Sequence, residues 1–243
     1  MKTEYTESTY GDRSAPIYDE WRPEAPAELI AALKDLAGAG PVLELGIGTG
    51  RIALKLARMG LEVHGIDSSE AMISRLRAKD GGGRIPVTVG NFSELGGGGN
   101  YSLVFVVFNT FFCLASQDEQ VRCFASVAKR LRNGGLFLIE AFIPDLTRFT
   151  RGQNTLATMV EADEVRLDVS QHDPLTQRVR SQHVVITEAG TRLYPVQVRY
   201  AWPSELDLMA RLAGMRLRER WSNWRREPLT GESTNHVSIY ELL

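Results

Sequence analysis

The chain is poor in the residues that build disulfide frameworks and metal centres. Among 243 residues there are two cysteines and four histidines. Cys113 and Cys123 lack the Cys-x-x-Cys spacing, and no histidine stands near either of them in the sequence. We therefore expect neither a metal ion nor a structural disulfide.

The chain also lacks an excess of one charge and any long hydrophobic run. Its 28 lysines and arginines balance 30 aspartates and glutamates, which leaves no electrostatic footprint for nucleic acid or an anionic membrane. The arginines at 216, 218 and 220 alternate with other residues, as on a solvated strand face. The start, Met1-Lys-Thr-Glu-Tyr, has no basic and apolar regions of a secretory signal, and no run is long enough for a membrane span. We expect a cytoplasmic protein without nucleic-acid or membrane partners.

What the chain does have is a glycine loop between a predicted strand and a predicted helix. The strand begins at Val42, and Gly46, Gly48 and Gly50 then remove side chains where a ligand must come close. The helix expected over 51–59 presents unpaired N–H groups at its start, which favour an anionic group. A second strand over 61–66 ends in Asp67, about twenty positions beyond the loop, where parallel α/β folds bind a ribose hydroxyl pair.

The spacing of the glycines favours one cofactor class over another. A dinucleotide fingerprint, G-x-G-x-x-G, needs glycine at position 51, where this chain has Arg51. Instead the pattern Glu44-x-Gly46-x-Gly48-x-Gly50 resembles motif I of the class I S-adenosylmethionine (SAM)-dependent methyltransferases. A nicotinamide or flavin cofactor, or a glycine turn that serves packing alone, stays open as an alternative.

This resemblance, which runs from about Pro41 to the last strand, implies an α/β fold with a Rossmann-like seven-stranded sheet, parallel except for an antiparallel last strand. Apolar runs at 85–89, 101–108 and 136–141 are expected strands, and 69–78, 118–131 and 204–213 are expected helices. Alternating segments around 155–170, 176–187 and 191–200 predict an antiparallel β meander between the fifth and sixth strands of the main sheet. We expect four units: a lid and first helix (1–40), the SAM-binding core (41–150), a substrate-capping meander (151–203), and a closing helix and hairpin (204–243).

Two loops after strands supply further expected cofactor residues. Gly90-Asn91-Phe92 resembles the family's adenine motif, in which the Asn91 carbonyl accepts from the exocyclic amine and Phe92 covers the ring. Asn91 shaping only a turn is the alternative. Phe108-Asn109 follows the fourth strand beneath the expected sulfonium, where Asn109 can hold the SAM amino group or orient a nucleophile. The full set of expected cofactor-binding residues is Tyr18, Glu44, Gly46, Ile47, Gly48, Gly50, Arg51, Asp67, Ser68, Met72, Asn91, Phe92, Phe108 and Asn109.

Three residues are candidates for the chemistry itself: Glu140, Asn109 and Tyr18. Glu140 ends the fifth strand, where a carboxylate can act as a base or orient an amine, although a salt bridge at the sheet rim would explain it too. Tyr18 belongs to a Tyr-Asp-x-Trp segment that resembles a lid over SAM in small-molecule methyltransferases. Docking of the first helix is the alternative for this segment. His183 in the meander has even odds of facing either side.

The resemblance implies transfer of the SAM methyl group to N or O of a small molecule or natural product by in-line displacement, with S-adenosylhomocysteine (SAH) as product. The prolines that follow Asn/Asp in amino-methylating DNA enzymes are absent after Asn109, which argues against a DNA base. Segments 199–214 and 109–112 are similar to peptide α-N-methyltransferases of the cypemycin type, so a peptide acceptor is an alternative. Two rival classes stay open. One is an enzyme that binds SAM or SAH but catalyses a non-methylating reaction such as cyclisation, and the other is a non-catalytic partner protein. We expect a monomer or a homodimer.

Overall fold

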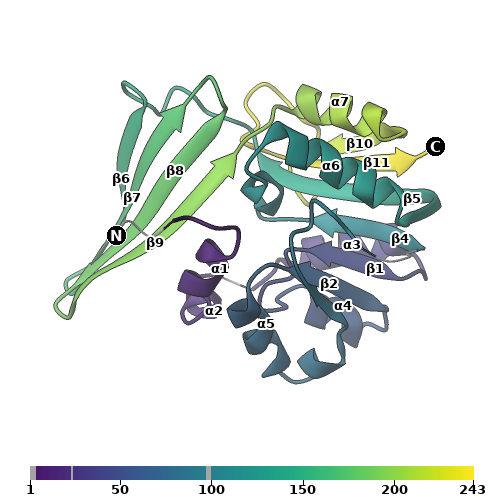
Figure 1. Ribbon diagram of the computed structural model, residues 1–243, viewed down its shortest axis with the longest axis horizontal. Helices are drawn as coiled ribbons and strands as arrows, with labels where there is room; N and C mark the ends of the chain where they lie inside the picture. The colour runs from purple at the N-terminus through teal and green to yellow at the C-terminus, as the bar shows by residue number, and fades with distance from the viewer. Residues whose placement is uncertain (1–3, 23, 97–99) are drawn as a thin grey trace.

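The computed structural model describes residues 4–22, 24–96 and 100–243. Residues 1–3, 23 and 97–99, which fall in the expected lid and core units, lie outside the described residues. The chain forms a seven-stranded sheet flanked by helices, and a separate four-stranded sheet beside it (Figure 1). The strands of the main sheet are β1 (Val42–Leu45), β2 (Val63–Asp67), β3 (Val87–Val89), β4 (Tyr101–Val106), β5 (Leu131–Phe142), β10 (Met215–Trp221) and β11 (Asn235–Leu242).

The order of the main sheet is β10-β11-β5-β4-β1-β2-β3. Strands β3, β2, β1, β4 and β5 are parallel neighbours, whereas β11 runs antiparallel to both β5 and β10. This arrangement confirms the predicted fold, in which six strands run one way and the last strand opposes them. The carboxyl ends of β1, β2, β4 and β5 therefore meet at one edge, where ligands bind in such sheets.

Helices cover both faces of the main sheet. The helices of the described residues are α1 (Thr9–Ser14), α2 (Tyr18–Trp21), α3 (Ala27–Ala37), α4 (Ala53–Arg58), α5 (Glu70–Arg77), α6 (Gln117–Ala128) and α7 (Pro203–Leu212), with short 3₁₀ helices η1 (Gly82–Arg84) and η2 (Thr110–Cys113). Of these, α1 and α2 lie beside the meander (Figure 1). Buried residues of α6 and α7 form one core cluster with the sheet, and those of α3 and α4 form the other. The result is a helix–sheet–helix sandwich.

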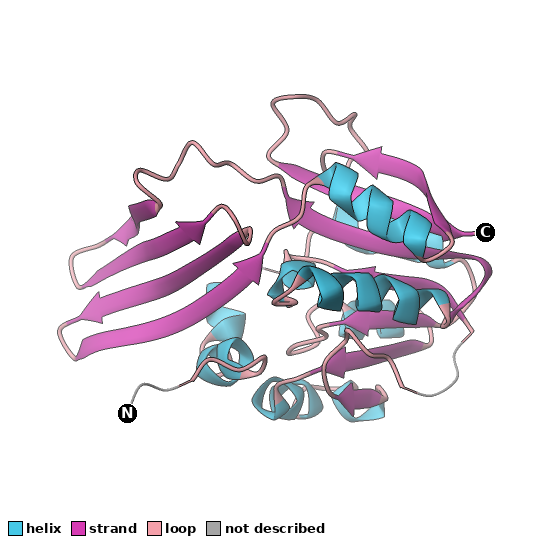
Figure 2. Ribbon diagram, turned by 45° about the horizontal axis from the view of Figure 1, so that its top comes forward, coloured by secondary structure: helices cyan, strands magenta, loops and turns pink. Residues whose placement is uncertain are grey.

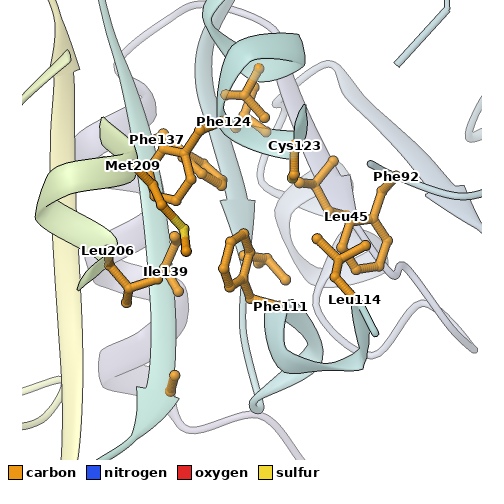
Figure 3. Close-up of a cluster of buried hydrophobic side chains, with 14 of the residues drawn as sticks. Leu45, Phe92, Phe111, Leu114, Cys123, Phe124, Phe137, Ile139, Leu206 and Met209 are labelled. Atoms are coloured by element: carbon orange, nitrogen blue, oxygen red, sulfur yellow. The ribbon is translucent and has the colours of Figure 1, made fainter. Parts of the chain in front are cut away.

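Aromatic side chains fill the core beneath α6 and α7 (Figure 3). Phe124 of α6 meets Phe137 of β5 and Phe111 of η2 edge to face, with ring centroids 5.1 and 5.6 Å apart. Burying one such side chain contributes about 1.5–3 kcal/mol. Helix α6 begins where Ser116 and Glu119 form a capping box. Because η2 lies in this cluster, the loop after β4 is fixed to the rigid part of the fold.

The second sheet is an antiparallel meander between β5 and α7, as predicted, but it has one more strand than expected. Its strands are β6 (Gln153–Val160), β7 (Glu164–Asp173), β8 (Arg178–Thr187) and β9 (Gly190–Arg199), in that order. The segment around 155–170, read as one alternating run, is two strands joined by a turn at Glu161-Ala162-Asp163. This turn contains neither glycine nor proline, so the sequence gives no strong signal for it.

Two strand ends also differ from the prediction. Strand β4 ends at Val106, so Phe108 lies in the following turn and not in the strand. Strand β5 begins at Leu131, because residues 132–135 bulge out of the ladder between the pairs Tyr101–Leu131 and Leu103–Leu136. Gly134 has φ +69° in this bulge, a conformation that favours glycine. No helix in the described part of the chain is long and apolar enough to span a membrane.

Candidate functional site

The glycine loop and the end of β2 are joined by the carboxylate of Asp67. The Gly48 N–H donates to Asp67 Oδ2 at 2.8 Å, and the Ser69 N–H donates to Asp67 Oδ1 at 2.9 Å. Burial raises the pKa of Asp67, against the lowering effect of these two N–H groups. The carboxylate thus sits at the carboxyl edge of the sheet beside the loop, as the spacing of the motif predicts.

The glycines of this loop serve different physical needs. Gly46 has φ +71°, and a Cβ there would lie 2.4 Å from Thr110 Cγ2. Gly48 has φ +56°, and the nearest atom to a Cβ there is the Gly46 carbonyl oxygen at 4.0 Å. Gly46 is therefore required for packing against η2, whereas the space beside Gly48 is open for a ligand.

Glu44 lies behind the loop in a buried position. Its side chain accepts a bond from the Ala53 N–H, and its Oε2 has no hydrogen-bond partner among the described residues. Burial raises the pKa of this carboxyl well above its usual range, although Arg51 lowers it. Glu44 therefore supports the glycine loop from behind, as a carboxyl that burial favours in its neutral form.

Replacing Glu44 with glutamine is expected to stabilise the ligand-free protein near neutral pH. Below the usual glutamate range both the folded and unfolded chains carry the proton, and the stabilising contribution is complete there. As pH rises through the elevated folded-state pKa, the fold must ionise a buried carboxyl, so this contribution is lost. Glutamine removes the loss, and about 1 kcal/mol would raise Tm by roughly 2–4 °C for a chain of this size.

Thermal melts of the wild type and E44Q across pH 4–8 test this expectation. The gain in Tm is expected at pH 7–8 and is expected to shrink toward pH 4. An equal Tm difference at every pH would show that the effect comes from packing and not from ionisation of Glu44.

The turn after β4 is strained and braced by Glu140. Phe108 and Asn109 have φ of +56° and +64°, where side chains other than glycine are uncommon. The Phe108 N–H donates to Glu140 Oε2 at 3.0 Å, and the Trp224 indole N–H donates to Glu140 Oε1 at 2.8 Å. Burial raises the pKa of Glu140, while the Phe108 and Trp224 donors lower it. Both carboxylate oxygens of Glu140 are thus engaged in holding the turn.

Asn109 and Arg51 complete this turn. Asn109 Oδ1 accepts from the Phe142 N–H at 2.7 Å, which ties the turn to the end of β5. The Arg51 guanidinium lies over the Phe108 ring, 4.2 Å from its centroid. Because Asn109 Oδ1 accepts from the Phe142 N–H, the orientation of the Asn109 side-chain amide nitrogen is fixed as well.

The N-terminal segment closes over the glycine loop. Asp19 Oδ1 accepts from Thr49 Oγ1 at 2.6 Å and from Lys79 Nζ at 2.9 Å, and Lys79 also donates to the Thr49 carbonyl. Lys79 and Thr49 lower the pKa of Asp19, against the raising effect of burial. Burial raises the pKa of the neighbouring Tyr18 to about 12, so its hydroxyl keeps its proton. Through Asp19, the N-terminal segment is therefore held against Thr49 of the glycine loop, where the expected cofactor site begins.

Further contacts extend this closure to the third strand. Ser69 Oγ donates to Asp12 at 2.7 Å, and Arg75 donates to the Pro16 carbonyl at 2.7 Å. The Asn91 amide donates to Glu7 at 2.5 Å, while its Oδ1 accepts from the Ser93 N–H. Asn91 therefore both shapes its own turn and holds the N-terminal segment.

One cavity of about 650 Å³ lies between the N-terminal segment, the carboxyl edge of the main sheet and the meander. The structure brings ten of the expected site residues to its wall: Tyr18, Gly46, Gly48, Asp67, Ser68, Met72, Asn91, Phe92, Phe108 and Asn109. The other five expected residues, Glu44, Ile47, Gly50, Arg51 and Glu140, are not among its lining residues. They stand behind the loop and the turn and support them.

The sequence predicts a meander that caps the substrate site, but of the meander residues that line the cavity it considers His183 alone and leaves open which way that residue faces. The wall residues from the meander and the chain start that it does not single out include Tyr5, Tyr10, Arg22, Asp168 and Ser181. Asp168 on β7 and His183 on β8 are directly opposite each other across the two strands. The alternation of Val179, Ser181 and His183 along β8 was the available signal, but alternation does not say which face is inside. Within the described residues no cluster suited to a metal ion is present.

These features define a ligand-binding α/β protein. One cavity holds both the glycine loop with Asp67, the carboxylate at the expected ribose position, and a chamber lined by the meander. Residues 42–135 match the family model described as a methyltransferase domain. Cypemycin N-terminal methyltransferase from Streptomyces sp is 26% identical over 201 residues, which is 82% of each chain. The structure of the CcbJ methyltransferase from Streptomyces caelestis is 43% identical, with a TM-score of 0.91 over 98% of this chain and 99% of that one.

The fold is also shared with SAM-bound CalS10, an amino pentose methyltransferase from Micromonospora echinaspora, at a TM-score of 0.69 and 19% identity over the full length of both chains. The chain belongs to the class I SAM-dependent methyltransferases. It is an enzyme, and its cofactor is SAM. The resemblance drawn from Glu44 to Gly50 is thereby confirmed.

Proposed function

We propose that this enzyme transfers the methyl group of SAM, by in-line displacement, to an amine nitrogen of a small natural product. The observation that carries the proposal is that a single cavity is lined both by Asp67, at the expected cofactor site, and by Asp168 and His183 of the meander. The names of two relatives point to nitrogen-bearing acceptors, since one is an N-terminal methyltransferase and one an amino pentose methyltransferase.

The residues around the glycine loop fit SAM by their chemistry. Asp67 offers a carboxylate to the ribose hydroxyls, and Gly48 leaves open space beside it. Phe92, Met72, Ser68 and Asn91 line the part of the cavity assigned to adenine. Bound SAM supplies an activated methyl group, so the protein contributes alignment and the exclusion of water.

Glu140 is assigned a positioning role here in place of the general base suggested by its place at the strand end. Its carboxylate is occupied by Phe108 and Trp224, and it is not among the cavity's lining residues. By holding Phe108 and Asn109 in a left-handed conformation, Glu140 fixes the turn that faces the expected sulfonium. Tyr18 and Asn109 line the cavity, and we assign them to the neighbourhood of the reacting groups.

The acceptor is assigned to the chamber formed with the meander. Apolar side chains, including Val179, Val196 and Val198, line it beside the polar pair Asp168 and His183. Burial lowers the pKa of His183, with Arg22 acting in the same direction and Asp168 against them. A neutral imidazole can accept the proton that the acceptor nitrogen loses, and Asp168 can stabilise the resulting charge.

Replacing His183 with glutamine, or Asp168 with asparagine, is expected to lower kcat/KM for the amine acceptor by about 10- to 100-fold, the loss of one charge-assisted hydrogen bond. SAM affinity is expected to stay within about threefold of the wild type, because neither residue lies beside the glycine loop. His64→Gln is the matched control, since His64 bonds to Tyr101 on β4, away from the cavity. Equal losses in the His64 and His183 variants would contradict the acceptor role.

The proposed function is tested by incubating the protein with SAM and a panel of acceptors, each present as an amine and as the matching alcohol. An amino sugar, a cyclic secondary amine and a short peptide with a free amino terminus cover the chemical range. Formation of SAH together with amine products that gain one methyl group is the expected result. Methylated alcohols alone would indicate O-methylation, a methylated peptide alone would indicate a peptide α-N-methyltransferase, and conversion without SAH would indicate a non-methylating reaction.

A further inference from the structure

Arg22 places a guanidinium on the wall of the cavity with no carboxylate paired to it. The residue directly follows α2, and its side chain is exposed and lines the cavity. Its Nη2 donates to the Tyr10 hydroxyl at 3.3 Å, and no aspartate or glutamate in the described part of the chain forms a salt bridge with it. Because an arginine side chain does not lose its proton in proteins, this wall offers a ligand a permanent positive charge.

The meander determines where this guanidinium lies. Both views of the chain show the N-terminal helices beside the meander (Figures 1 and 2). The Trp21 ring meets the Tyr194 ring edge on, with centroids 4.6 Å apart, and the Arg166 guanidinium lies over Trp21, 4.9 Å from its centroid. Tyr194 of β9 is directly opposite His183 of β8, so both side chains lie on the cavity face of the sheet. Docking of Trp21 therefore brings the next residue, Arg22, to the His183 side of the cavity.

Two opposite charges lie near His183 without pairing with each other. Burial lowers the pKa of His183, and of the two charges Asp168 raises it whereas Arg22 lowers it. Asp168 accepts from Ser170 Oγ at 3.0 Å, and it forms no salt bridge with Arg22 or any other described residue. This end of the cavity thus offers one carboxylate and one guanidinium to a ligand. An acceptor that carries both an amine and a carboxylate complements this pair.

We propose that the acceptor bears a carboxylate close to its nucleophilic nitrogen, and that Arg22 binds this carboxylate and selects for it. This proposal rests on the proposed function, because it names the class of amine. Tyr18, four residues before Arg22, lines the same cavity, so α2 presents a residue assigned to the reacting groups together with the carboxylate-binding guanidinium. A guanidinium can form two parallel hydrogen bonds to a carboxylate, which fixes the orientation of the acceptor.

A singly charged carboxylate fits this wall better than a phosphate does. Arg148, the other arginine that lines the cavity, lies beside Asp145 and over the Phe149 ring, 4.9 Å from its centroid. Arg22 is therefore the cavity arginine without a neighbouring acid of its own. A phosphate group carries about −1.5 to −2 charges at neutral pH, more than one guanidinium balances, and Asp168 would oppose the excess.

Binding to the SAH-loaded protein tests the selection without turnover. The probes are piperidine-2-carboxylate, its carboxamide and the matching phosphonate, and calorimetry measures each affinity. The wild type is expected to bind the carboxylate about 10- to 100-fold more tightly than the carboxamide, the effect of one charge-assisted contact, and R22Q is expected to bind the two within about threefold. R148Q is the matched control and is expected to keep the preference. Titration with SAH alone shows that each variant is folded.

Four outcomes of the binding experiment overturn the proposal. They are equal affinities of the wild type for the carboxylate and the carboxamide, binding of neither, tighter binding of the phosphonate, and a preference that survives in R22Q. Weaker discrimination in R22K, which keeps the charge but loses the planar fork of donors, is the result expected if both charge and geometry contribute.

Turnover with SAM separates this proposal from the proposed function. The ratio of kcat/KM between the carboxylate and the carboxamide is expected to match the ratio of their affinities. Methylation of both amines with equal kcat/KM would overturn selection by Arg22 and leave transfer to an amine standing. A preference in binding without any methylated amine would contradict the proposed function and leave carboxylate binding by Arg22 standing.

Discussion

Asp67→Ala is expected to raise the dissociation constants of SAM and SAH by about 100-fold. The carboxylate of Asp67 already accepts from the Gly48 and Ser69 N–H groups, which fixes its position before the ligand arrives. Two charge-assisted hydrogen bonds to the ribose hydroxyls, at about 1.5 kcal/mol each, together correspond to about 3 kcal/mol, or roughly 100-fold in affinity. Isothermal titration calorimetry measures both constants directly.

Asp80→Ala is the control for this experiment, because Asp80 is an exposed carboxylate that lies outside the cavity. Asp67→Asn separates charge from shape, since the amide keeps one acceptor oxygen and is expected to lose less affinity than alanine. The raised pKa of Asp67 adds a pH effect of known sign. SAM binding is expected to weaken on acidification at a higher pH than an ordinary aspartate would give. Unchanged SAM affinity in Asp67→Ala would remove Asp67 from the cofactor site.

Gly48→Val is expected to abolish measurable SAM binding while the protein stays folded. A Cβ at this position meets no protein atom closer than 4.0 Å, and Gly48 lines the cavity. The valine side chain therefore occupies space that the ligand needs. It also places a β-branched residue at φ +56°, which costs stability of the order of 1–3 kcal/mol.

Gly60→Val separates these two effects. Gly60 has φ +85°, and nothing lies within 4 Å of a Cβ built there, but it stands after α4 and outside the cavity. Both variants are expected to lower Tm by similar amounts, and Gly48→Val alone is expected to lose SAM binding. Equal loss of binding in the two variants would mean that strain or partial unfolding, and not blocked space, explains the result.

The cofactor half of the site could be predicted from the sequence because its signal is local. Glu44, Gly46, Gly48 and Gly50 lie within seven consecutive residues, and the fold brings the next strand end, with Asp67, beside them. The roles of Glu44 and Glu140 could not be read in the same way. Whether a carboxyl reaches a ligand or braces a turn depends on which N–H groups lie around it, and Trp224 lies 84 residues from Glu140 in sequence.

The acceptor half depends on contacts between distant segments. Alternation in β8 predicts a strand with two unlike faces, but only the packing of the meander beside the N-terminal segment decides that His183 faces the cavity. The opposition of Asp168 and His183 depends on strand register, which the turn at 174–177 sets.

The sequence by itself predicted strands and helices from their periodicity and a ligand-binding loop from its glycines, because these signals act over short stretches of chain. The seven-stranded fold and SAM followed from the resemblance of the Glu44–Gly50 pattern to motif I of the class I methyltransferases. Only the tertiary structure decided which carboxylates line the cavity, how the N-terminal segment closes over Asp67, and which side of the meander is a wall. Those properties arise from contacts between residues far apart in the chain, such as Asn91 with Glu7, and no local pattern encodes them.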